Sequence, residues 1–220
     1  MVGGRWCQDG STRKQTKELN RPSESFFPTL VTWGKIAALL SGRRFRLMFS
    51  DEGRFGRITD PHGCWCPKGM RPVTHCQIIR EYTYAYAALS PDDGELDTLI
   101  LPNMYTSTFS VFLKEVSKRH PDDFILWIHD GAPSHRSGTL EVPENIRLVE
   151  QPPYSPELNP VEHLWEEMRE KEFWNASFKS MRAVEKAMVK SLRRLEKDRA
   201  LVQSMSAFPW IMRGLASVAY

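Results

Sequence analysis

Several features that mark common protein classes are missing from this sequence of 220 residues. No segment approaches the roughly 18 apolar residues of a membrane span, and the N-terminus has no apolar signal core. We found no glycine-rich phosphate loop, no Ser-His-Asp arrangement and no internal repeat. We therefore expect a cytoplasmic protein with no membrane partner, and its four cysteines then argue against disulfides.

The charges of the chain are nearly balanced overall but unevenly distributed. The formal net charge is +3 and the isoelectric point is about 8.7, a weak indication of binding to a polyanion. Residues 177–200 carry eight Lys or Arg against three acids, and apolar residues repeat along the opposite side. This pattern predicts an amphipathic helix whose basic face either follows a phosphate backbone or is simply solvated.

Composition along the chain predicts one folded domain with polar ends. Hydrophobic residues make up 41% of the sequence, enough for a full core. Residues 1–29 are polar and charged without periodicity, so we expect them to be flexible. The domain is predicted over residues 30–205, including the basic helix, and residues 206–220 are expected to form a tail.

A cluster of cysteines and histidines raises the question of a zinc site. It comprises His62, Cys64, Cys66, His75 and Cys76. The Cys-x-Cys pair is tighter than the usual zinc knuckle, and no second pair follows at finger spacing. A hairpin that contains thiols is the better interpretation, and the role of the cluster stays open.

An aspartate follows the apolar run at residues 124–129. A continuous apolar stretch of this length, ended by a Gly-Ala-Pro turn, is typical of a strand buried on both faces. Asp130 therefore lies where the strand is expected to stop. Active residues of open α/β sheets gather beyond the carboxyl ends of strands, although a single aspartate there is more often a turn former or a helix cap.

A second aspartate, Asp51, follows the run at residues 45–50. Alternate residues of this run are apolar and share one face with Asp51. Gly53 and Gly56 are expected to end the strand just after it. On its own, Asp51 also has an ordinary interpretation as a turn or cap residue.

A third carboxylate lies in the first turn of a predicted helix. Asn159 is a good N-cap, Pro160 suits the first helical position, and Glu162 then falls at the third. Apolar residues repeat at helical spacing from Val161 to Met168. The ordinary alternative is a capping box, in which Glu162 folds back onto the Asn159 backbone N–H.

Together, the three carboxylates predict a pocket for divalent cations. Asp51, Asp130 and Glu162 are oxygen ligands of the kind that Mg²⁺ prefers. Two ions held there can activate an attacking oxygen and stabilise a leaving oxygen at phosphorus. We therefore interpret this set as a candidate metal-dependent site for cutting nucleic acid.

The expected order of elements indicates an α/β fold with a mixed sheet and helices on both faces. Three antiparallel strands come first and two parallel strands follow. The predicted elements are a lead-in helix at 30–40, strands at 43–50, 57–66 and 73–89, a helix at 106–119, strands at 124–129 and 146–150, and helices at 160–173 and 177–203.

Three segments resemble the acidic motifs of the DDE transposases. They are residues 49–56 (Phe-Ser-Asp-Glu-Gly-Arg-Phe-Gly), 128–135 (Ile-His-Asp-Gly-Ala-Pro-Ser-His) and 153–165 (Pro-Tyr-Ser-Pro-Glu-Leu-Asn-Pro-Val-Glu-His-Leu-Trp). The turn at residues 65–72 is also similar to the turn after the first strand in the bacterial insertion-sequence 630 / mariner-type superfamily. The third motif is the most specific. Gly131 stands where this group often has asparagine, which puts the rate in doubt more than the reaction class.

The resemblance implies a ribonuclease-H-like fold and a Mg²⁺-dependent enzyme, with Mn²⁺ as a substitute, that cleaves and transfers DNA strands. Asp51, Asp130 and Glu162 would be the triad that holds two ions. DNA, as transposon ends and target, would be the partner of a homodimer associated with the nucleoid. His129 is a further candidate for holding phosphate or ordering water. The candidate DNA contacts are Lys68, Arg71, His135, Lys186, Lys190, Arg193 and Arg194, each with an ordinary structural or surface alternative.

Members of this group carry helix-turn-helix modules before the catalytic domain, whereas only 50 residues precede Asp51 here and show no pair of amphipathic helices. We expect a catalytic half, served by a separately encoded DNA-reading N-terminal half or derived from a decayed or truncated copy. Two alternatives stay open: a non-catalytic DNA-binding remnant and another nuclease of the same fold.

Overall fold

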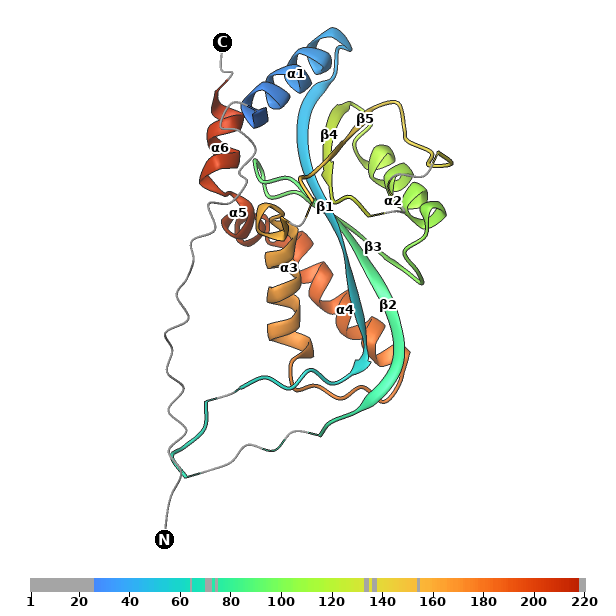
Figure 1. The fold of residues 1–220 in the computed structure, drawn as a ribbon, viewed down its shortest axis with the longest axis vertical. Coiled ribbons are helices and arrows are strands. Elements are labelled where there is room, and N and C mark those ends of the chain that lie inside the picture. Colours follow the sequence, from blue (N-terminus) through green and yellow to red (C-terminus); the bar gives the residue numbers. More distant parts are fainter. Residues whose placement is uncertain are drawn as a thin grey trace.

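The computed structural model describes residues 26–217, apart from residues 64, 70–72, 74, 133, 134, 136, 137 and 154. No helix in this part of the chain is long and apolar enough to cross a membrane. The elements follow one another (Figure 1) in the order α1 (Phe26–Leu40), β1 (Arg44–Ile58), β2 (Ile78–Leu89), β3 (Leu96–Leu101), α2 (Thr106–Arg119), β4 (Asp123–His129), β5 (Ile146–Glu150), η2 (Pro156–Leu158), α3 (Val161–Met168), η3 (Arg169–Phe173), α4 (Met181–Lys197), α5 (Arg199–Ser206) and α6 (Pro209–Ala216).

The strands form a mixed sheet in the order β3-β2-β1-β4-β5. β1 pairs antiparallel with β2 and parallel with β4, while β2 pairs antiparallel with β3 and β4 pairs parallel with β5. The predicted fold class, three antiparallel strands followed by two parallel ones, is confirmed. β1 is the central strand. Its ladder with β4 begins where Arg44 pairs with Asp123 and ends where Phe49 pairs with Ile128.

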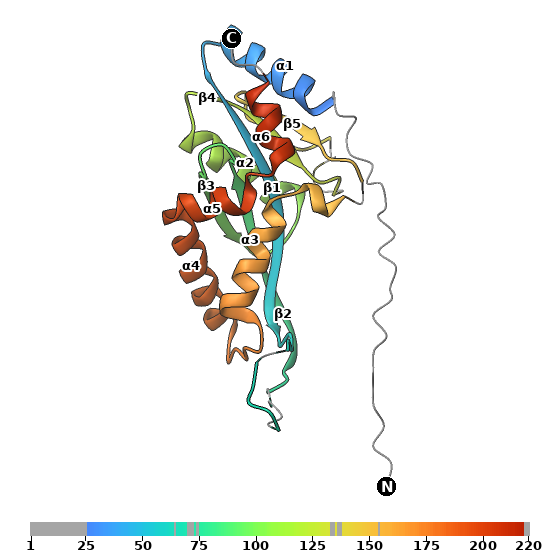
Figure 2. The same ribbon diagram turned by 90° about the vertical axis from the view of Figure 1, so that its left-hand side faces the viewer.

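Helices cover both faces of the sheet and enclose two hydrophobic clusters. α2 covers one face, where Phe109 and Phe112 pack with Trp127 of β4. The other helices gather on the opposite face (Figure 2), where Trp165 of α3 and Leu192 of α4 are buried. Alternate residues of β1 point to opposite faces, as the pleat requires.

The first two predicted strands are in fact one strand. β1 continues from Arg44 to Ile58, so the expected break at Gly53 and Gly56 is wrong. Both glycines permit a close approach instead: a Cβ on Gly53 would lie 2.8 Å from the Trp165 ring, and one on Gly56 would lie 2.4 Å from the Glu81 carbonyl oxygen. The third antiparallel strand is β3, which the sequence patterns missed.

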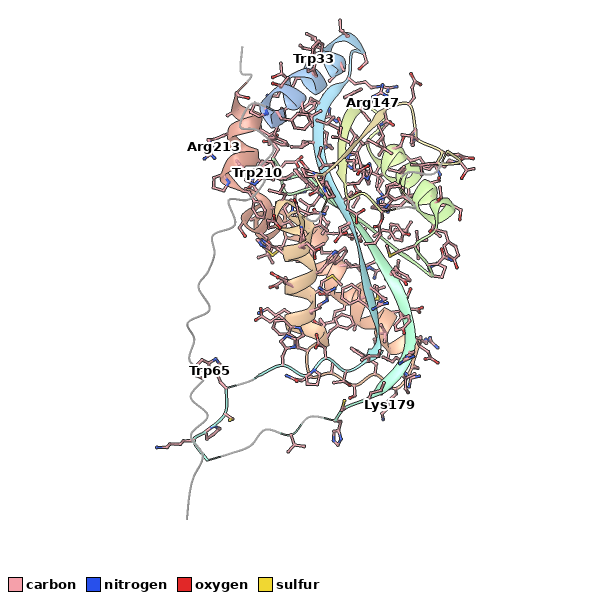
Figure 3. All side chains as sticks on the ribbon, in the orientation of Figure 1. Trp33, Trp65, Arg147, Lys179, Trp210 and Arg213 are labelled. Carbon is pink, nitrogen blue, oxygen red and sulfur yellow. The ribbon has the colours of Figure 1, made fainter. Side chains whose placement is uncertain are left out.

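The predicted long helix at 177–203 is divided into α4 and α5. Asp198 has a non-helical backbone, and its carboxylate accepts a hydrogen bond from the Leu201 N–H at 3.0 Å, so it caps α5. The segment expected to be a tail contains α6. Trp210 of α6 is labelled in Figure 3. Its ring packs edge to face on the ring of Phe27 in α1, with centroids 4.7 Å apart, so α6 and α1 together cover this end of the sheet.

The predicted lead-in helix is confirmed as α1, which begins at Phe26 rather than residue 30. It lies against α6 and the adjacent ends of β1 and β4. Trp33 is exposed on its outer side (Figure 3). The remaining residues of the predicted flexible segment, 1–25, lie outside the described part of the chain.

Candidate active site

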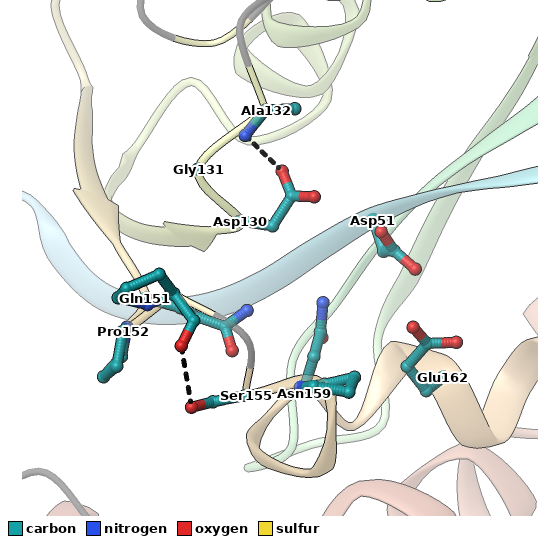
Figure 4. A pocket seen from close by; sticks show the side chains of 11 residues that line it. Asp51, Asp130, Gly131, Ala132, Gln151, Pro152, Ser155, Asn159 and Glu162 are labelled. Carbon is teal, nitrogen blue, oxygen red and sulfur yellow. Dashed lines mark hydrogen bonds between the residues drawn. The ribbon is translucent and has the colours of Figure 1, made fainter. Parts of the chain in front are cut away.

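Three carboxylates line one cavity of about 460 Å³ where β1, β4 and the start of α3 meet. They belong to Asp51, Asp130 and Glu162, the set that the sequence predicted to converge. Gln151 and Asn159 also contribute to the wall (Figure 4). Segments far apart in the sequence therefore bring oxygen atoms together around an open space.

Asp51 lies within β1 rather than at its end. It pairs with Ala87 of β2, while the parallel ladder with β4 has already stopped at Phe49. The side chain of Asp51 thus lines the cavity beyond the end of this ladder, although the strand itself continues. Its Oδ2 atom accepts a hydrogen bond of 2.8 Å from Trp165 Nε1, which fixes the carboxylate against α3.

Asp130 is the first residue after β4, as predicted. Its Oδ1 atom accepts a hydrogen bond from the Ala132 N–H at 3.1 Å and forms an ion pair with His135 Nδ1 at 2.9 Å. The same Nδ1 atom lies 3.2 Å from the backbone carbonyl oxygen of Asp130. Hydrogen bonding from His135 is the largest effect that lowers the pKa of Asp130. This carboxylate is therefore ionised and oriented, while about half of its side chain surface, 49%, is exposed.

The start of α3 is fastened to β1 by Asn159. The Asn159 amide donates to the Ser50 carbonyl oxygen at 3.1 Å, and its Oδ1 atom accepts from the Val161 N–H at 3.2 Å. One buried side chain thus accepts from the first N–H of the helix and ties the helix to the residue before Asp51. Glu162, in the first turn, is carried to the cavity by this link.

The capping-box alternative for Glu162 is wrong. The backbone N–H of Asn159 donates to the Pro156 carbonyl oxygen at 2.9 Å, so it is not available to Glu162. The helix itself begins at Val161, with Pro160 as the residue before it, one position later than predicted. The shift leaves Glu162 in the first turn and facing the cavity.

The acids repel one another electrostatically. Burial first, and then the charges of Glu162 and Glu52, raise the pKa of Asp51 to about 7 against the opposing effect of the hydrogen bond from Trp165. Burial, followed by the charges of Glu166 and Asp130, also raises the pKa of Glu162. A cation in the cavity would relieve this repulsion.

Behind Asp130 lies a buried pair that sequence reasoning did not find, Glu52 and His135. His135 Nε2 donates to Glu52 Oε1 at 3.0 Å, and the side chains are 1% and 2% exposed. Burial opposes the charge of His135, but the hydrogen bonds to Asp130 and Glu52 prevail and raise its pKa to about 10. The imidazole is therefore a cation that donates from both nitrogens. Glu52 gave no local signal, because its side chain lies on the opposite face of β1 from Asp51.

Gln151 is a second residue that the sequence patterns missed. It follows β5, and its backbone N–H donates to the His129 carbonyl oxygen at 2.8 Å. The residue is 8% exposed and lines the cavity, yet its buried Oε1 atom has no hydrogen-bond partner among the residues that the structure describes. The only sequence signal was its place at the end of a third parallel strand.

The predicted DNA contacts do not gather at the cavity. Lys68 is exposed on the long β1–β2 connection, which extends away from the sheet near Trp65 (Figure 3), and Arg71 lies outside the described residues. His135 is buried in the pair described above. On α4, Lys186 and Arg193 are exposed.

Two other basic residues of α4 are already paired with acids. Lys190 Nζ lies 3.0 Å from Glu172 Oε1, and Arg194 lies 3.0 Å from Glu167 Oε1. No residue of α4 lines the cavity.

The cysteine and histidine cluster does not assemble a metal site within the part of the chain that the structure describes. His62 stacks on Trp174 with ring centroids 3.9 Å apart, and Cys66, His75 and Cys76 are exposed. Cys64 lies outside the described residues. Within the described part of the chain, one group of three His, Cys, Asp or Glu side chains has ligand atoms that all lie within 4.8 Å of one another, and it consists of His129, Asp130 and His135.

The His129–Asp130–His135 group is a hydrogen-bond network around Asp130 rather than a metal centre. Both nitrogens of His135 already face carboxylates. His129 Nδ1 lies 2.5 Å from the Asp130 carbonyl oxygen, and burial lowers the pKa of His129. His129 is thus buried behind the cavity, and not among the residues that line it.

Comparison with known proteins gives both a family and a fold. Residues 46–185 match the family described as DDE superfamily endonuclease. The uncharacterized protein y4pE/y4sA of Sinorhizobium fredii (strain NBRC 101917 / NGR234) is 37% identical over 99 residues, which is 44% of this chain and 73% of that protein.

Solved structures of the mariner Mos1 transposase have a similar fold. The pre-cleavage Mos1 transpososome has a TM-score of 0.55 at 13% identity, over 99% of this chain and 66% of that chain. The Mos1 paired end complex with Mn has a TM-score of 0.54 at 14% identity, over 99% and 66%. The Mos1 catalytic domain has a TM-score of 0.50 at 13% identity, over 91% and 95%.

The predicted ribonuclease-H-like arrangement of the sheet is therefore confirmed. The chain spans about two thirds of the length of the Mos1 chains in the DNA complexes. It covers nearly all of the isolated catalytic domain.

Proposed function

This chain belongs to the DDE superfamily endonucleases, and we propose that its three-carboxylate cavity cleaves DNA and transfers DNA strands with two divalent metal ions. Asp51, Asp130 and Glu162 are the proposed ligands and catalytic residues. The observation that carries the proposal is their convergence on one cavity, where burial, followed by the charges of Glu162 and Glu52, raises the pKa of Asp51 to about 7.

The residues of the cavity fit Mg²⁺ or Mn²⁺. All three acids offer oxygen atoms, which are the ligands that these hard cations prefer. Gln151 adds a buried amide oxygen for which the described part of the chain provides no partner. A buried polar oxygen left unpaired is costly, so its position supports binding of a cation or of a water molecule held by one.

The bound ions would supply an activated oxygen nucleophile and stabilise the leaving oxygen at phosphorus. The protein's own contribution is to hold its carboxylates in place. Trp165 fixes Asp51, the Ala132 N–H and His135 fix Asp130, and Asn159 fixes the helix that carries Glu162. The open cavity leaves room for a DNA phosphate beside these groups.

We propose that the nucleophile is water in the cleavage step and a DNA 3′-hydroxyl in strand transfer. The Mos1 structures are described as paired-end and strand-transfer complexes with a transposon end. By extension, transposon ends and target DNA are the proposed substrates of this chain. A homodimer is the proposed active assembly, and reading of the ends is proposed to fall to a separate DNA-reading part.

A nicking assay on supercoiled plasmid tests this proposal. We expect nicking with Mg²⁺ or Mn²⁺ and none with Ca²⁺ alone, and we expect D51N, D130N and E162Q each to abolish it. Asp122 and Glu170 are exposed acids outside the cavity, so D122N and E170Q are matched controls that should nick like the wild type.

The outcome also separates the alternatives. DNA binding without nicking under any metal would favour a non-catalytic remnant. Cleavage of RNA–DNA hybrids in preference to duplex DNA would favour another nuclease of this fold. Full activity in any one of the three acid variants would remove that residue from the triad.

A further inference from the structure

The buried Glu52–His135 pair connects two segments of the active site from behind. Glu52 directly follows Asp51 on β1, and His135 belongs to the turn that follows Asp130. The His135 ring packs against Phe109 of α2 with centroids 4.0 Å apart, so it has little freedom to move. Its Nε2 atom is anchored on Glu52 and its Nδ1 atom on Asp130.

This arrangement determines which carboxylate oxygen of Asp130 is available to a metal ion. Among the described residues, the two groups against the carboxylate are the Ala132 N–H, which donates to Oδ1, and His135 Nδ1, which is paired with Oδ1 and also lies 3.2 Å from the Asp130 backbone carbonyl oxygen. The other oxygen, Oδ2, points toward Asp51 (Figure 4). A carboxylate held in this way cannot turn freely to offer both oxygens to one ion.

The preferences of the two common divalent cations make this restraint informative. Mg²⁺ demands a near-octahedral set of ligands, whereas Ca²⁺ accepts more ligands, flexible geometry and bidentate carboxylates. Groups that orient a ligand through hydrogen bonds tune the metal site that the ligand belongs to. A fixed one-oxygen carboxylate therefore suits Mg²⁺ better than Ca²⁺.

We propose that Glu52 and His135 are positioning residues that hold Asp130 as a one-oxygen ligand and thereby make the site select Mg²⁺ over Ca²⁺. This inference rests on the proposed function, because it requires Asp130 to bind the metal. Neither residue touches DNA or metal; Glu52 acts through His135, and His135 acts through Asp130.

Metal competition tests the proposal without any catalytic readout. Binding of Mn²⁺ to the whole chain is followed by electron paramagnetic resonance, with Mg²⁺ and Ca²⁺ as competitors. In H135A, the ratio of Ca²⁺ affinity to Mg²⁺ affinity should rise about tenfold or more. E52A keeps the His135 ring but removes the carboxylate that anchors it, so it should also raise the ratio of Ca²⁺ affinity to Mg²⁺ affinity. This variant replaces H135A as the test if H135A does not fold.

Two further variants control for charge and for stability. In E52Q the amide oxygen can still accept from His135, so the ratio should stay within about twofold of the wild type. The chain also offers a matched histidine, His120, which lies 2.6 Å from Asp97 and 3.7 Å from Asp123 and is 11% exposed. His120 lies at the end of β4 that is far from Asp130, so H120A should lower stability without changing the ratio of Ca²⁺ affinity to Mg²⁺ affinity.

The possible failures are distinguishable. If D130N binds Mn²⁺ as tightly as the wild type, Asp130 is not a ligand and the proposed function fails. If D130N loses binding while H135A and E52A keep the wild-type ratio, only the positioning role is overturned. If both affinities change by the same factor in H135A, the pair acts through charge alone and the proposal is also overturned.

Discussion

Asp51 in β1 and Asp130 directly after β4 occupy equivalent positions relative to the parallel ladder of these two strands. The last pair of the β1–β4 ladder joins Phe49 to Ile128, and each aspartate lies two residues beyond it. Phe49 and Ile128 both belong to the hydrophobic cluster on the face that carries α3. Since strand residues two apart share a face, both carboxylates are directed to the side from which Glu162 arrives.

Metal binding should depend on pH through Asp51. Its pKa is raised from 3.8 to about 7, so the carboxyl is largely protonated below neutral pH in the metal-free protein. Because a divalent cation requires the ionised form, we expect affinity for Mn²⁺ to rise as pH increases from 6 to 8, with release of a proton on binding. Calorimetric titration in two buffers of different ionisation enthalpy measures that proton; release of none would contradict the prediction.

The stability of the metal-free protein should fall as pH rises. The folded state holds the Asp51 proton more tightly than the unfolded state, so stability decreases between about pH 4 and pH 7. His135, whose pKa is raised from 6.5 to about 10, contributes stability that is fully present below about pH 6.5 and is lost as pH approaches 10. Thermal unfolding followed by circular dichroism from pH 5 to pH 10, with chelator present, checks this trend.

The same reasoning predicts that D51N stabilises the metal-free protein while it abolishes the proposed activity. Asparagine keeps an oxygen to accept from Trp165 but carries no buried charge. One unit of pKa elevation corresponds to about 1.4 kcal/mol, so a gain of more than about 1 kcal/mol at pH 8 is expected. Urea unfolding measures it, with D122N as the exposed control; a gain that persists at pH 4 would point to another cause.

Packing beneath α3 leads to a prediction about Gly53. A Cβ at this position would lie 2.8 Å from both the Phe55 and Trp165 rings. Overpacking of this kind typically costs about 1–3 kcal/mol, so we expect G53A to lower the free energy of unfolding by that amount and to weaken Mn²⁺ binding, because Trp165 holds Asp51. Gly63 has no atom within 4 Å of a built Cβ, so G63A is the control that should change neither quantity.

Two of the three acids that the sequence predicted to converge are marked by clear local patterns. Asp130 ends a continuous apolar run, and Glu162 follows an asparagine and a proline that start a helix. The strand limits were harder to predict, because glycine within a sequence read as a strand usually suggests a break. Gly53 and Gly56 are present for contacts with Trp165 and Glu81, and contacts so distant in sequence leave no local pattern.

The Glu52–His135 pair behind Asp130 could not be predicted from local sequence patterns either, because its partners are also distant in sequence. Glu52 lies on the face of β1 opposite Asp51, and its partner His135 is 83 residues away. A pattern of apolar residues specifies which face is buried, but it does not specify which polar group is buried with it. Only the three-dimensional arrangement shows that His135, taken from the sequence as a DNA contact, is enclosed between two carboxylates.

Gln151 should matter for function but little for stability. No described residue pairs with its buried Oε1 atom, so an apolar replacement of similar size removes an unpaired polar group. We expect Q151L to unfold at the wild-type temperature or above, and to bind Mn²⁺ or DNA less tightly. Thermal melts check the expected stability, and titrations with Mn²⁺ and with DNA check the expected loss of binding. If Q151L binds both ligands like the wild type, the Gln151 amide has no role in binding.

Binding of DNA by α4 should appear in the dependence of affinity on salt. Lys186 and Arg193 are exposed, whereas Lys190 and Arg194 are held by acids of η3 and α3. Removing one cation that neutralises a DNA phosphate should reduce the slope of log affinity against log salt concentration by about 0.9, so K186A and R193A should each lower it.

Lys118 provides the control for that measurement. It is an equally charged residue with 76% of its side chain exposed, but it belongs to α2 on the opposite face of the sheet. If phosphates follow α4, K118A should leave the slope unchanged, because salt dependence reports the ions displaced where phosphates bind and not the charge of the whole protein. An equal reduction in K118A would mean that net charge alone attracts DNA, and α4 would then have no special part in binding.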